Sequence, residues 1–280
     1  MSRNVRIVSN GWIALLLLVG IWCSSWTVAG MQTATAAANN DTAANEGAST
    51  DGARIPVVYL AGDSTVQTYR SAQRPQAGWG QMIAGYFDDG VQFSNRAIGG
   101  RSSRSFIEQG RLDTIVSLLQ PGDYLMVQFG HNDADFSKPE RYTPVNDYRQ
   151  YLKTYIDRAH SKGATPILVT PVSRRDYNAS TGQFNPSFPD YVQAMKQVAA
   201  ETNTLLIDLN ARSVALYNET GVEGTKSIFL HVAPGEYSAF PNGAQDNTHF
   251  QEQGAVKIAG LIAAGIQELN IPLSGHVIHP

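Results

Sequence analysis

The first strand of the fold lies in IPVVYLAGDSTV, residues 55–66. Its apolar run from Ile55 to Ala61 has the length of a strand and ends at Gly62 and Asp63, which favour a turn. A continuous apolar run of this length is typical of a strand that is buried on both faces, as in a parallel sheet.

Short strands and helices alternate along the rest of the chain. Similar apolar runs predict strands at residues 91–98, 124–129, 166–170 and 205–209. Apolar spacing and capping residues predict helices at 79–87, 104–119, 144–162, 189–202 and 251–269, with an irregular stretch at 221–250. In the third of these helices we expect Thr143 to be the cap and Pro144 the first residue. The alternation predicts one α/β domain with a parallel sheet covered on both faces.

The first 53 residues differ in composition from the rest. A basic start at Arg3 and Arg6, an apolar run and a group of small residues predict a signal peptide over residues 1–30. Residues 31–53 are rich in Ala, Thr, Asn and Gly and predict a flexible tether. We therefore expect a secreted protein with its globular domain over 54–280. An uncleaved N-terminal membrane anchor is the alternative.

Composition narrows the function classes. The 280 residues carry 21 Lys and Arg against 24 Asp and Glu, a net charge of −3 that becomes −5 when Arg3 and Arg6 leave with the leader. This charge does not provide the basic surface on which nucleic-acid binding depends, so we expect no nucleic-acid partner. The single cysteine, Cys23, lies in the predicted leader, so the sequence offers no internal disulfide. After leader cleavage we expect no membrane contact.

Three residues could carry nucleophilic chemistry at the carboxyl edge of the sheet, where ligands of such folds bind. Ser64 follows the first strand, and Asp246 and His249 are close enough in sequence for the carboxylate to orient the imidazole. Taken singly, Ser64 and Asp246 could each be a helix cap, and His249 a surface histidine. Together they supply the nucleophile, acid and base of Ser-His-Asp catalysis.

Two further loops offer hydrogen-bond donors to a negatively charged oxygen. Gly99 and Gly100 end the second strand, and glycine lets backbone N–H groups approach a ligand closely. Asn132 follows the third strand and carries a side-chain NH₂ group. A plain strand-to-helix turn and ordinary turn chemistry are the alternatives for these two loops.

Other residues compete for a functional role. Ser102 and Ser103 are alternative nucleophiles, which we expect to cap a helix instead. The spacing of His131, Asp133 and Asp135 could suit a metal ion, but no second His or Cys pair completes a ligand set. We therefore expect neither a metal nor another cofactor.

Four ordered blocks of sequence resemble the SGNH, or GDSL-like, hydrolases, whose blocks supply Ser, Gly, Asn and His in this chain order. The blocks are YLAGDSTV at 59–66, NRAIGGRSSRSF at 95–106, QFGHNDAD at 128–135 and DNTHF at 246–250. These blocks, and FLHVAPGEYSAFPNG at 229–243, are similar to the rhamnogalacturonan acetylesterase group. The resemblance covers essentially residues 55–270.

The resemblance implies a three-layer α/β/α sandwich of the flavodoxin-like type with five parallel strands. It makes Ser64 the nucleophile, His249 the general base and Asp246 the carboxylate that orients the base. The oxyanion donors would be the backbone N–H groups of Ser64 and Gly100 and the side chain of Asn132. The second glycine of its pair is preferred because it directly precedes Arg-Ser.

The residues and the resemblance together predict a secreted serine esterase that removes O-acetyl groups from a plant polysaccharide or oligosaccharide, above all rhamnogalacturonan. It would be a monomer that acts through an acyl-enzyme. Candidates to bind substrate are Arg101, Arg174, Arg175 and His231. The arginines could pair with uronate carboxylates or form salt bridges with neighbouring acids. The alternatives are an acetylxylan esterase, a short-chain lipase or thioesterase, and a non-catalytic carbohydrate-binding protein.

Overall fold

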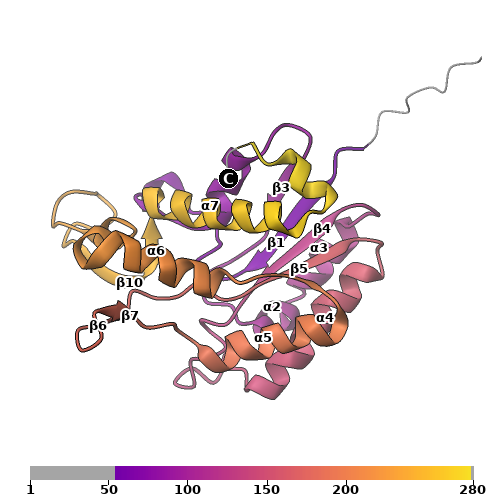
Figure 1. The fold of residues 1–280 in the computed structure, drawn as a ribbon, viewed down its shortest axis with the longest axis horizontal. Helices are drawn as coiled ribbons and strands as arrows, with labels where there is room; N and C mark the ends of the chain where they lie inside the picture. The colour runs from indigo at the N-terminus through magenta and orange to yellow at the C-terminus, as the bar shows by residue number, and fades with distance from the viewer. Residues whose placement is uncertain (1–53, 279–280) are drawn as a thin grey trace, which may run out of the picture. The chain divides into compact units, whose positions relative to one another are not determined.

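A five-stranded parallel sheet forms the centre of the computed structural model, which describes residues 54–278 (Figure 1). The strand order is β3-β1-β4-β5-β8. In that order the strands span Gln92–Asn95, Val57–Gly62, Tyr124–Gln128, Thr165–Val169 and Leu205–Ile207. The predicted α/β fold class and its five-stranded parallel sheet are confirmed. The predicted leader and tether lie outside the described residues.

The strand order fixes where a site can form. The chain runs from β1 to the edge strand β3 and then returns past β1 to β4, so the order reverses at β1. Gly62, at the end of β1, is in register with Gln128, at the end of β4. Because ligands bind beyond the carboxyl ends of strands at such a switch point, the loops after Gly62 and Gln128 are the expected place of a site.

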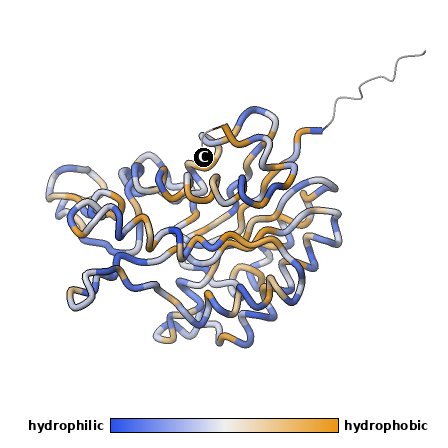
Figure 2. The backbone as a smooth tube through the Cα atoms, in the orientation of Figure 1, coloured by the Kyte–Doolittle hydropathy of each residue, from blue (hydrophilic) through white to orange (hydrophobic). Residues whose placement is uncertain are grey.

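Helices cover both faces of the sheet, so alternate strand residues belong to two cores. Val58 and Leu60 of β1 pack in one core, and Tyr59 and Ala61 pack in the other. Figure 1 shows helical layers on both sides of the sheet, and Figure 2 shows the hydrophobic strands between them. The first layer contains α1 (Trp79–Met82), α6 (Leu209–Gly224) and α7 (Glu252–Leu269), and the second contains α2 (Ser103–Glu108), α3 (Arg111–Leu118), α4 (Val145–His160) and α5 (Pro189–Thr202).

A smaller antiparallel sheet carries the C-terminal strand. Its order is β2-β10-β9, with β2 at Gln76–Ala77, β10 at Ala244–Gln251 and β9 at Phe229–Val232. A two-stranded hairpin joins β6 (Tyr177–Asn178) to β7 (Gln183–Phe184). Single 3-10 turns lie at Ser71–Gln73, Ile83–Tyr86, Thr225–Ser227 and Pro272–His276. No helix between residues 54 and 278 is both long and apolar enough to cross a membrane.

The prediction of an irregular stretch at 221–250 was wrong. That stretch contains β9 and most of β10, and the residues before it form α6, a helix that the sequence did not predict. Polar residues hid this helix, since its buried face includes Asn210 and Ser213. The strand predicted to reach Leu209 stops at Ile207, because the Asp208 side chain caps α6.

Two helix boundaries also differ from the prediction. The helix expected over 104–119 is two helices, α2 and α3, separated at Gly110, whose φ of +68° ends regular helix. Pro144 is the N-cap of α4 rather than its first residue, and the Thr143 hydroxyl donates to the Arg141 carbonyl instead of capping the helix.

Candidate active site

Ser64 lies directly beyond the carboxyl end of β1, in a turn that buried groups hold in place. The Asp63 carboxyl accepts hydrogen bonds from the Thr65 N–H at 2.9 Å and the Thr65 hydroxyl at 2.8 Å. The N–H groups of Val66 and Gln67 both donate to the Asp63 carbonyl. The turn leaves Ser64 half-buried at the edge of the sheet.

A buried chain of hydrogen bonds joins this turn to the core. The Trp79 indole N–H of α1 donates to Gln128 Oε1 at 2.9 Å. Gln128 Nε2, at the end of β4, donates to Thr65 Oγ1 at 2.6 Å. The position of Ser64 is therefore set by side chains from a helix and a neighbouring strand as well as by its own turn.

Ser64, His249 and Asp246 form a continuous hydrogen-bonded line. His249 Nε2 lies 2.9 Å from Ser64 Oγ, and His249 Nδ1 lies 2.6 Å from Asp246 Oδ2. The other Asp246 oxygen accepts from the backbone N–H groups of Thr248 and His249, at 2.7 and 3.0 Å. The structure thus brings together three predicted site residues, although Ser64 and His249 are 185 positions apart.

The environment of Asp246 keeps its carboxyl ionised. Partial burial opposes the charge, but the hydrogen bond and charge of His249, with the two backbone N–H groups, outweigh it and lower the pKa of Asp246 to about 2. An ionised carboxylate at Nδ1 favours the imidazole tautomer whose Nε2 lone pair faces Ser64. This is the arrangement that a base needs to remove the hydroxyl proton.

Asp246 and His249 lie in strand β10, within the stretch that was expected to be irregular. Residues three apart on a regular strand point to opposite faces of the sheet. The register of β10 against β9 shifts between Asp246 and Phe250, where Phe250 resumes pairing with Phe229 and with Ala77 of β2. Such an irregularity redirects side chains, which explains how both groups reach the same site.

Two backbone N–H groups near the Ser64 hydroxyl, those of Ser64 itself and of Gly100, are free to donate. The Gly99 N–H already donates to the Gln67 side chain. In contrast, no hydrogen bond within the described chain uses the N–H of Ser64 or of Gly100. Gly100 has a φ of +78°, a conformation that favours glycine. The free N–H of the glycine pair is therefore the one that the sequence resemblance selected.

Asn132 and the next residue join the second and third loops. Asn132 Nδ2 donates to the Arg101 carbonyl at 2.9 Å, and because an amide nitrogen carries two hydrogens, one remains for a ligand. The Asp133 carboxyl accepts from the Ser103 hydroxyl at 2.5 Å and from the Ser103 N–H at 3.0 Å. These bonds fix the loops that carry Gly100 and Asn132 relative to one another.

The competing residues serve other purposes. Ser102 caps α2, accepting from the Ser105 N–H at 3.1 Å. His131 Nε2 lies 2.9 Å from a backbone carbonyl, whereas the Asp135 carboxylate pairs with an arginine. The three candidate metal ligands thus have separate partners. Over residues 54–278, no group of three or more His, Cys, Asp or Glu side chains could hold a metal ion.

Two buried ionisable groups lie next to the site. Burial lowers the pKa of His131 to about 4, with a partial offset from the negative charge of Asp63. Burial also raises the pKa of Asp133 to about 7, against the stabilising hydrogen bonds from Ser103. His131 is consequently neutral near pH 7.

Two of the predicted substrate-binding arginines lie on the rim near these loops. Arg101 donates to the Gly99 carbonyl at 2.7 Å. Arg174 is exposed, and its guanidinium lies over the Phe188 ring, 4.9 Å from the ring centre. Neither arginine forms an ion pair with a described carboxylate. The salt-bridge alternative is therefore wrong for both.

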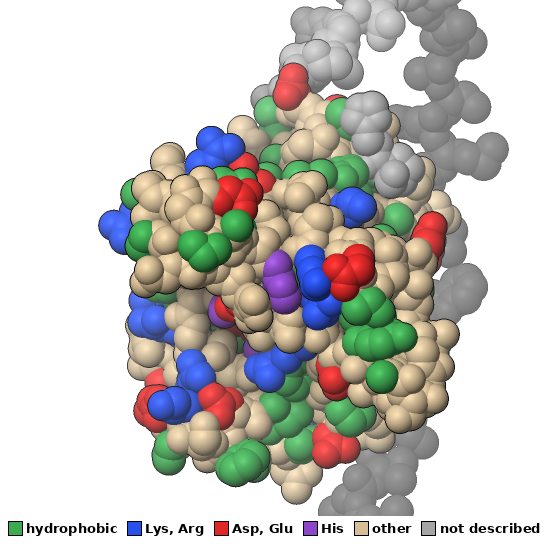
Figure 3. Space-filling view, turned by 90° about the vertical axis from the view of Figure 1, so that its left-hand side faces the viewer, with side chains coloured by type: hydrophobic (Ala, Val, Ile, Leu, Met, Phe, Trp, Pro, Cys, Tyr) green, Lys and Arg blue, Asp and Glu red, His purple; other side chains and the backbone are tan. Residues whose placement is uncertain are grey.

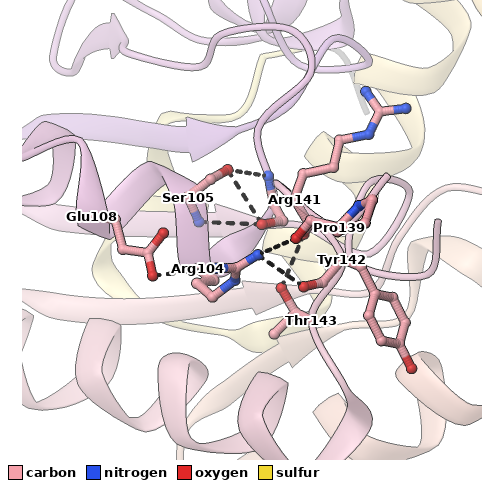
Figure 4. Close-up of polar contacts among 8 residues, drawn as sticks. Arg104, Ser105, Glu108, Pro139, Arg141, Tyr142 and Thr143 are labelled. Carbon is pink, nitrogen blue, oxygen red and sulfur yellow. Dashed lines mark hydrogen bonds and ion pairs between the residues drawn. The ribbon is translucent and has the colours of Figure 1, made fainter. Parts of the chain in front are cut away.

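Arg104 behaves differently. It forms a long ion pair with Glu108 at 3.4 Å and donates to the carbonyls of Pro139 and Tyr142 (Figure 4). These bonds tie α2 to the loop before α4. Arg104 is thus a structural residue.

Arg175 and His231, the other two predicted substrate-binding residues, both contact Asn247. The Arg175 guanidinium donates to the Thr225 hydroxyl at 3.0 Å and the Val222 carbonyl at 2.7 Å. The Arg175 N–H donates to the Asn247 carbonyl at 2.9 Å, and His231 Nε2 lies 2.8 Å from Asn247 Oδ1. Figure 3 shows that histidine, basic and acidic side chains lie close together on the face of the molecule that looks to the left in Figure 1.

Sequence reasoning missed two residues that shape these places. The Gln67 side chain accepts a hydrogen bond from the N–H of Gly99. Lys226 lines a cavity together with Arg175 and His231. Gln67 lies just beyond the first sequence block, and Lys226 lies in the stretch that was predicted to be irregular. Neither position carries a local sequence signal for its role.

A hydroxyl, an imidazole and a carboxylate in line, next to free backbone N–H groups at the carboxyl edge of a parallel sheet, define the class of serine hydrolases. Residues 60–256 match the model of the GDSL-like Lipase/Acylhydrolase family. The chain belongs to this family, also known as the SGNH hydrolases, and is a carboxylic ester hydrolase, as predicted.

Curated relatives agree with this assignment. The chain is 49% identical over 222 residues to the probable rhamnogalacturonan acetylesterase YesY of Bacillus subtilis, which covers 79% of this chain and 97% of the relative. It is 42% identical over 221 residues to the rhamnogalacturonan acetylesterase RhgT of the same organism, covering 79% and 94%. The predicted resemblance to the rhamnogalacturonan acetylesterase group is confirmed.

Solved structures share the fold. The crystal structure of protein YxiM from Bacillus subtilis has a TM-score of 0.68 at 30% identity and covers 79% of this chain, and the chain spans only 58% of that structure's length. A catalytic mutant of an acetylxylan esterase from Geobacillus stearothermophilus has a TM-score of 0.53 at 18% identity, covering 75% and 93%. The second likeness concerns the fold alone.

Proposed function

We propose that the chain is a secreted serine esterase that removes O-acetyl groups from a plant cell-wall polysaccharide, in the first place rhamnogalacturonan. The hydrogen-bonded line from Ser64 through His249 to Asp246 carries this proposal. The names of two relatives, both rhamnogalacturonan acetylesterases, support the substrate. No cofactor is needed for this chemistry.

The reaction begins when Ser64 Oγ attacks the acetyl carbonyl carbon. His249 Nε2, 2.9 Å away, takes the hydroxyl proton as the new bond forms, and Asp246 stabilises the imidazolium. The N–H groups of Ser64 and Gly100 and the amide of Asn132 donate to the carbonyl oxygen as it becomes negative. His249 then gives its proton to the sugar oxygen, which leaves as an alcohol.

Water completes the reaction on the acyl-enzyme. His249 takes a proton from a water molecule as the water oxygen attacks the acetyl carbon. The same donors hold the second oxyanion, which collapses to release acetate. The proton on His249 returns to Ser64, so the enzyme regains its starting state.

Acetate release from three polymers, measured side by side, tests this proposal. The wild-type protein should deacetylate rhamnogalacturonan faster than acetylated xylan or acetylated homogalacturonan, and Ser64→Ala should release no acetate above background. Faster release from xylan would make the protein an acetylxylan esterase. Activity in a folded Ser64→Ala variant would refute the serine mechanism. A wild type that binds the polymers but releases nothing would be a carbohydrate-binding protein.

Acyl-chain preference separates an acetylesterase from a lipase or thioesterase. With aryl esters of increasing acyl length, kcat/KM should fall sharply beyond the shortest chains. A rise with chain length would favour the lipase or thioesterase alternative.

Arg174 is a candidate for holding a uronate carboxylate near the ester, because it is exposed and has no described carboxylate partner. Arg174→Ala should lower kcat/KM several-fold on the polymer and leave a small aryl acetate unchanged. Arg158→Ala, which removes an ion-paired arginine on α4, is the matched control. Equal loss on both substrates would count against this role.

The proposed secretion rests on the composition of residues 1–30. N-terminal sequencing of the protein from culture medium or periplasm should give a start within or just before residues 31–53. A membrane-bound protein that starts at residue 1 would favour the anchor alternative.

A further inference from the structure

A cavity of about 440 Å³ lies beside the candidate active site, on the strands that carry its C-terminal residues. Gln245 and Asn247 line it, and these residues stand on either side of Asp246 in β10. Asp246 itself points to His249. The cavity is therefore separate from the catalytic line but shares its strand, and its volume lies in the range of small-molecule sites.

The lining of the cavity suits a sugar that carries a carboxylate. The side chains of Gln245, Asn247 and His231 offer both donors and acceptors, as the hydroxyl groups of a sugar require. Arg175 and Lys226 add two cationic groups. Val232 and Ala244 are the aliphatic side chains of this lining, and the other five side chains are polar or charged.

Arg175 and Lys226, counted together with the neighbouring Glu223, give the cavity a net charge of one positive unit. Lys226 pairs with the exposed Glu223 at 2.7 Å. Arg175 has no carboxylate partner in the described part of the chain, and its guanidinium is held by the Thr225 hydroxyl and the Val222 carbonyl. An arginine held by neutral groups keeps its charge and loses little rotamer freedom when an anion binds.

Hydrogen bonds join the lining of the cavity to the strand that carries Asp246 and His249. The backbone N–H of Arg175 and the ring of His231 both contact Asn247, which adjoins Asp246. The cavity and the catalytic carboxylate therefore lie on neighbouring residues of one strand, as two binding places for a single polymer would require.

We infer that this cavity is a subsite for a uronate unit of the polysaccharide, separate from the unit that is deacetylated. The subsite rests on the proposed function, because it presupposes a polymeric acetylated substrate. Arg175 and Lys226 recognise the carboxylate, while His231, Gln245 and Asn247 contact sugar hydroxyls. The subsite distinguishes uronate-containing polymers from neutral ones.

Charge removal on both partners tests the subsite. Lys226→Gln should raise KM several-fold on an acetylated uronate oligosaccharide and leave kcat unchanged. The same variant should behave like wild type on the carboxyl-reduced oligosaccharide and on an aryl acetate. Glu223→Gln should act in the opposite direction and lower KM on the uronate substrate. Lys153→Gln, which removes a lysine on α4 that pairs with Glu201, is the control and should change KM on neither substrate.

The outcomes separate this inference from the proposed function. A wild-type protein that releases no acetate from any uronate polymer refutes the proposed function. If the wild type is active but Lys226→Gln and Glu223→Gln leave the KM ratio of charged to reduced substrate unchanged, the subsite is refuted and the esterase proposal stands. Loss of activity on the aryl acetate in Lys226→Gln would show a structural role for the lysine and would also overturn the subsite.

Discussion

The hydrogen-bond chain beneath the candidate nucleophile makes a quantitative prediction for Thr65→Val. In the native protein, Thr65 Oγ1 accepts from Gln128 Nε2 at 2.6 Å and donates to the Asp63 carboxyl at 2.8 Å. Asp63, Thr65, Gln128 and Trp79 are each no more than 1% exposed. Valine has nearly the same shape as threonine, so the substitution removes the hydroxyl without leaving a cavity.

The cost follows from the groups that lose a partner. Gln128 Nε2 has no other acceptor among residues 54–278, and a buried donor without a partner costs about 1–3 kcal/mol. The lost bond to Asp63 adds about 1 kcal/mol, while the Thr65 N–H still donates to the same oxygen. We therefore expect Thr65→Val to lower the free energy of unfolding by about 2–4 kcal/mol. A smaller kcat should accompany this loss, because the turn that positions Ser64 loosens.

Urea unfolding followed by tryptophan fluorescence measures the first effect, and hydrolysis of an aryl acetate measures the second. Thr65→Ser is the matched control: it retains the hydroxyl and should lose only about 1 kcal/mol through its missing methyl group. If Thr65→Val unfolds at the same urea concentration as wild type with an unchanged slope, the hydrogen-bond chain contributes nothing and the reasoning is refuted.

Three further variants, one of them with a matched control, test other parts of the molecule. Asn132→Ala should lower kcat about 100- to 1,000-fold, since one oxyanion donor is lost. Its lost bond to the Arg101 carbonyl should lower the free energy of unfolding by only about 1 kcal/mol, and a folded variant with wild-type kcat would remove Asn132 from the mechanism. Burial raises the pKa of Asp133 to about 7, so the native state retains a proton that the unfolded state releases near pH 4. The contribution of Asp133 to the free energy of unfolding should therefore fall as the pH rises from 4 to 7. Urea titrations of Asp133→Asn should show a flatter pH dependence, and an unchanged one would contradict this. Gly254→Ala should cost about 2–3 kcal/mol, because its Cβ would lie 1.9 Å from the Ile228 carbonyl oxygen. Gly85→Ala, whose Cβ would meet nothing within 4 Å, should leave the thermal midpoint near that of wild type.

The central sheet was predictable because each of its strands has a plain apolar signature. Runs such as that of β1 are buried on both faces, so nearly every residue is hydrophobic and the pattern is visible in a single sequence. Helix α6 was not predictable, because tertiary contacts satisfy polar groups on its buried side. The Asn210 amide donates to the carbonyls of Pro171 and Ser187, and such partners cannot be read from the sequence of the helix.

Part of the candidate site could be predicted from the sequence, and part could not. Ser64, Gly100 and Asn132 follow predicted strands, so the rule that ligands bind at the carboxyl edge of the sheet is enough to group them. The shift of register that turns Asp246 and His249 to one side was not visible in the sequence, because the bulge depends on pairing with β9. The cavity of Arg175 and Lys226 was likewise invisible, because its walls come from segments far apart in the chain.

The short pairing between Phe250 and Ala77 has a consequence for biosynthesis. It attaches the strand that carries the proposed base to a segment just after the nucleophile, although nearly two hundred residues separate the two groups in the chain. Contacts of such sequence separation close late in folding. If Ser64 and His249 act as proposed, a growing chain carries its nucleophile long before its base, and we expect no hydrolysis until β10 has been made and has docked. Esterase activity therefore requires synthesis at least as far as β10 and the docking of that strand.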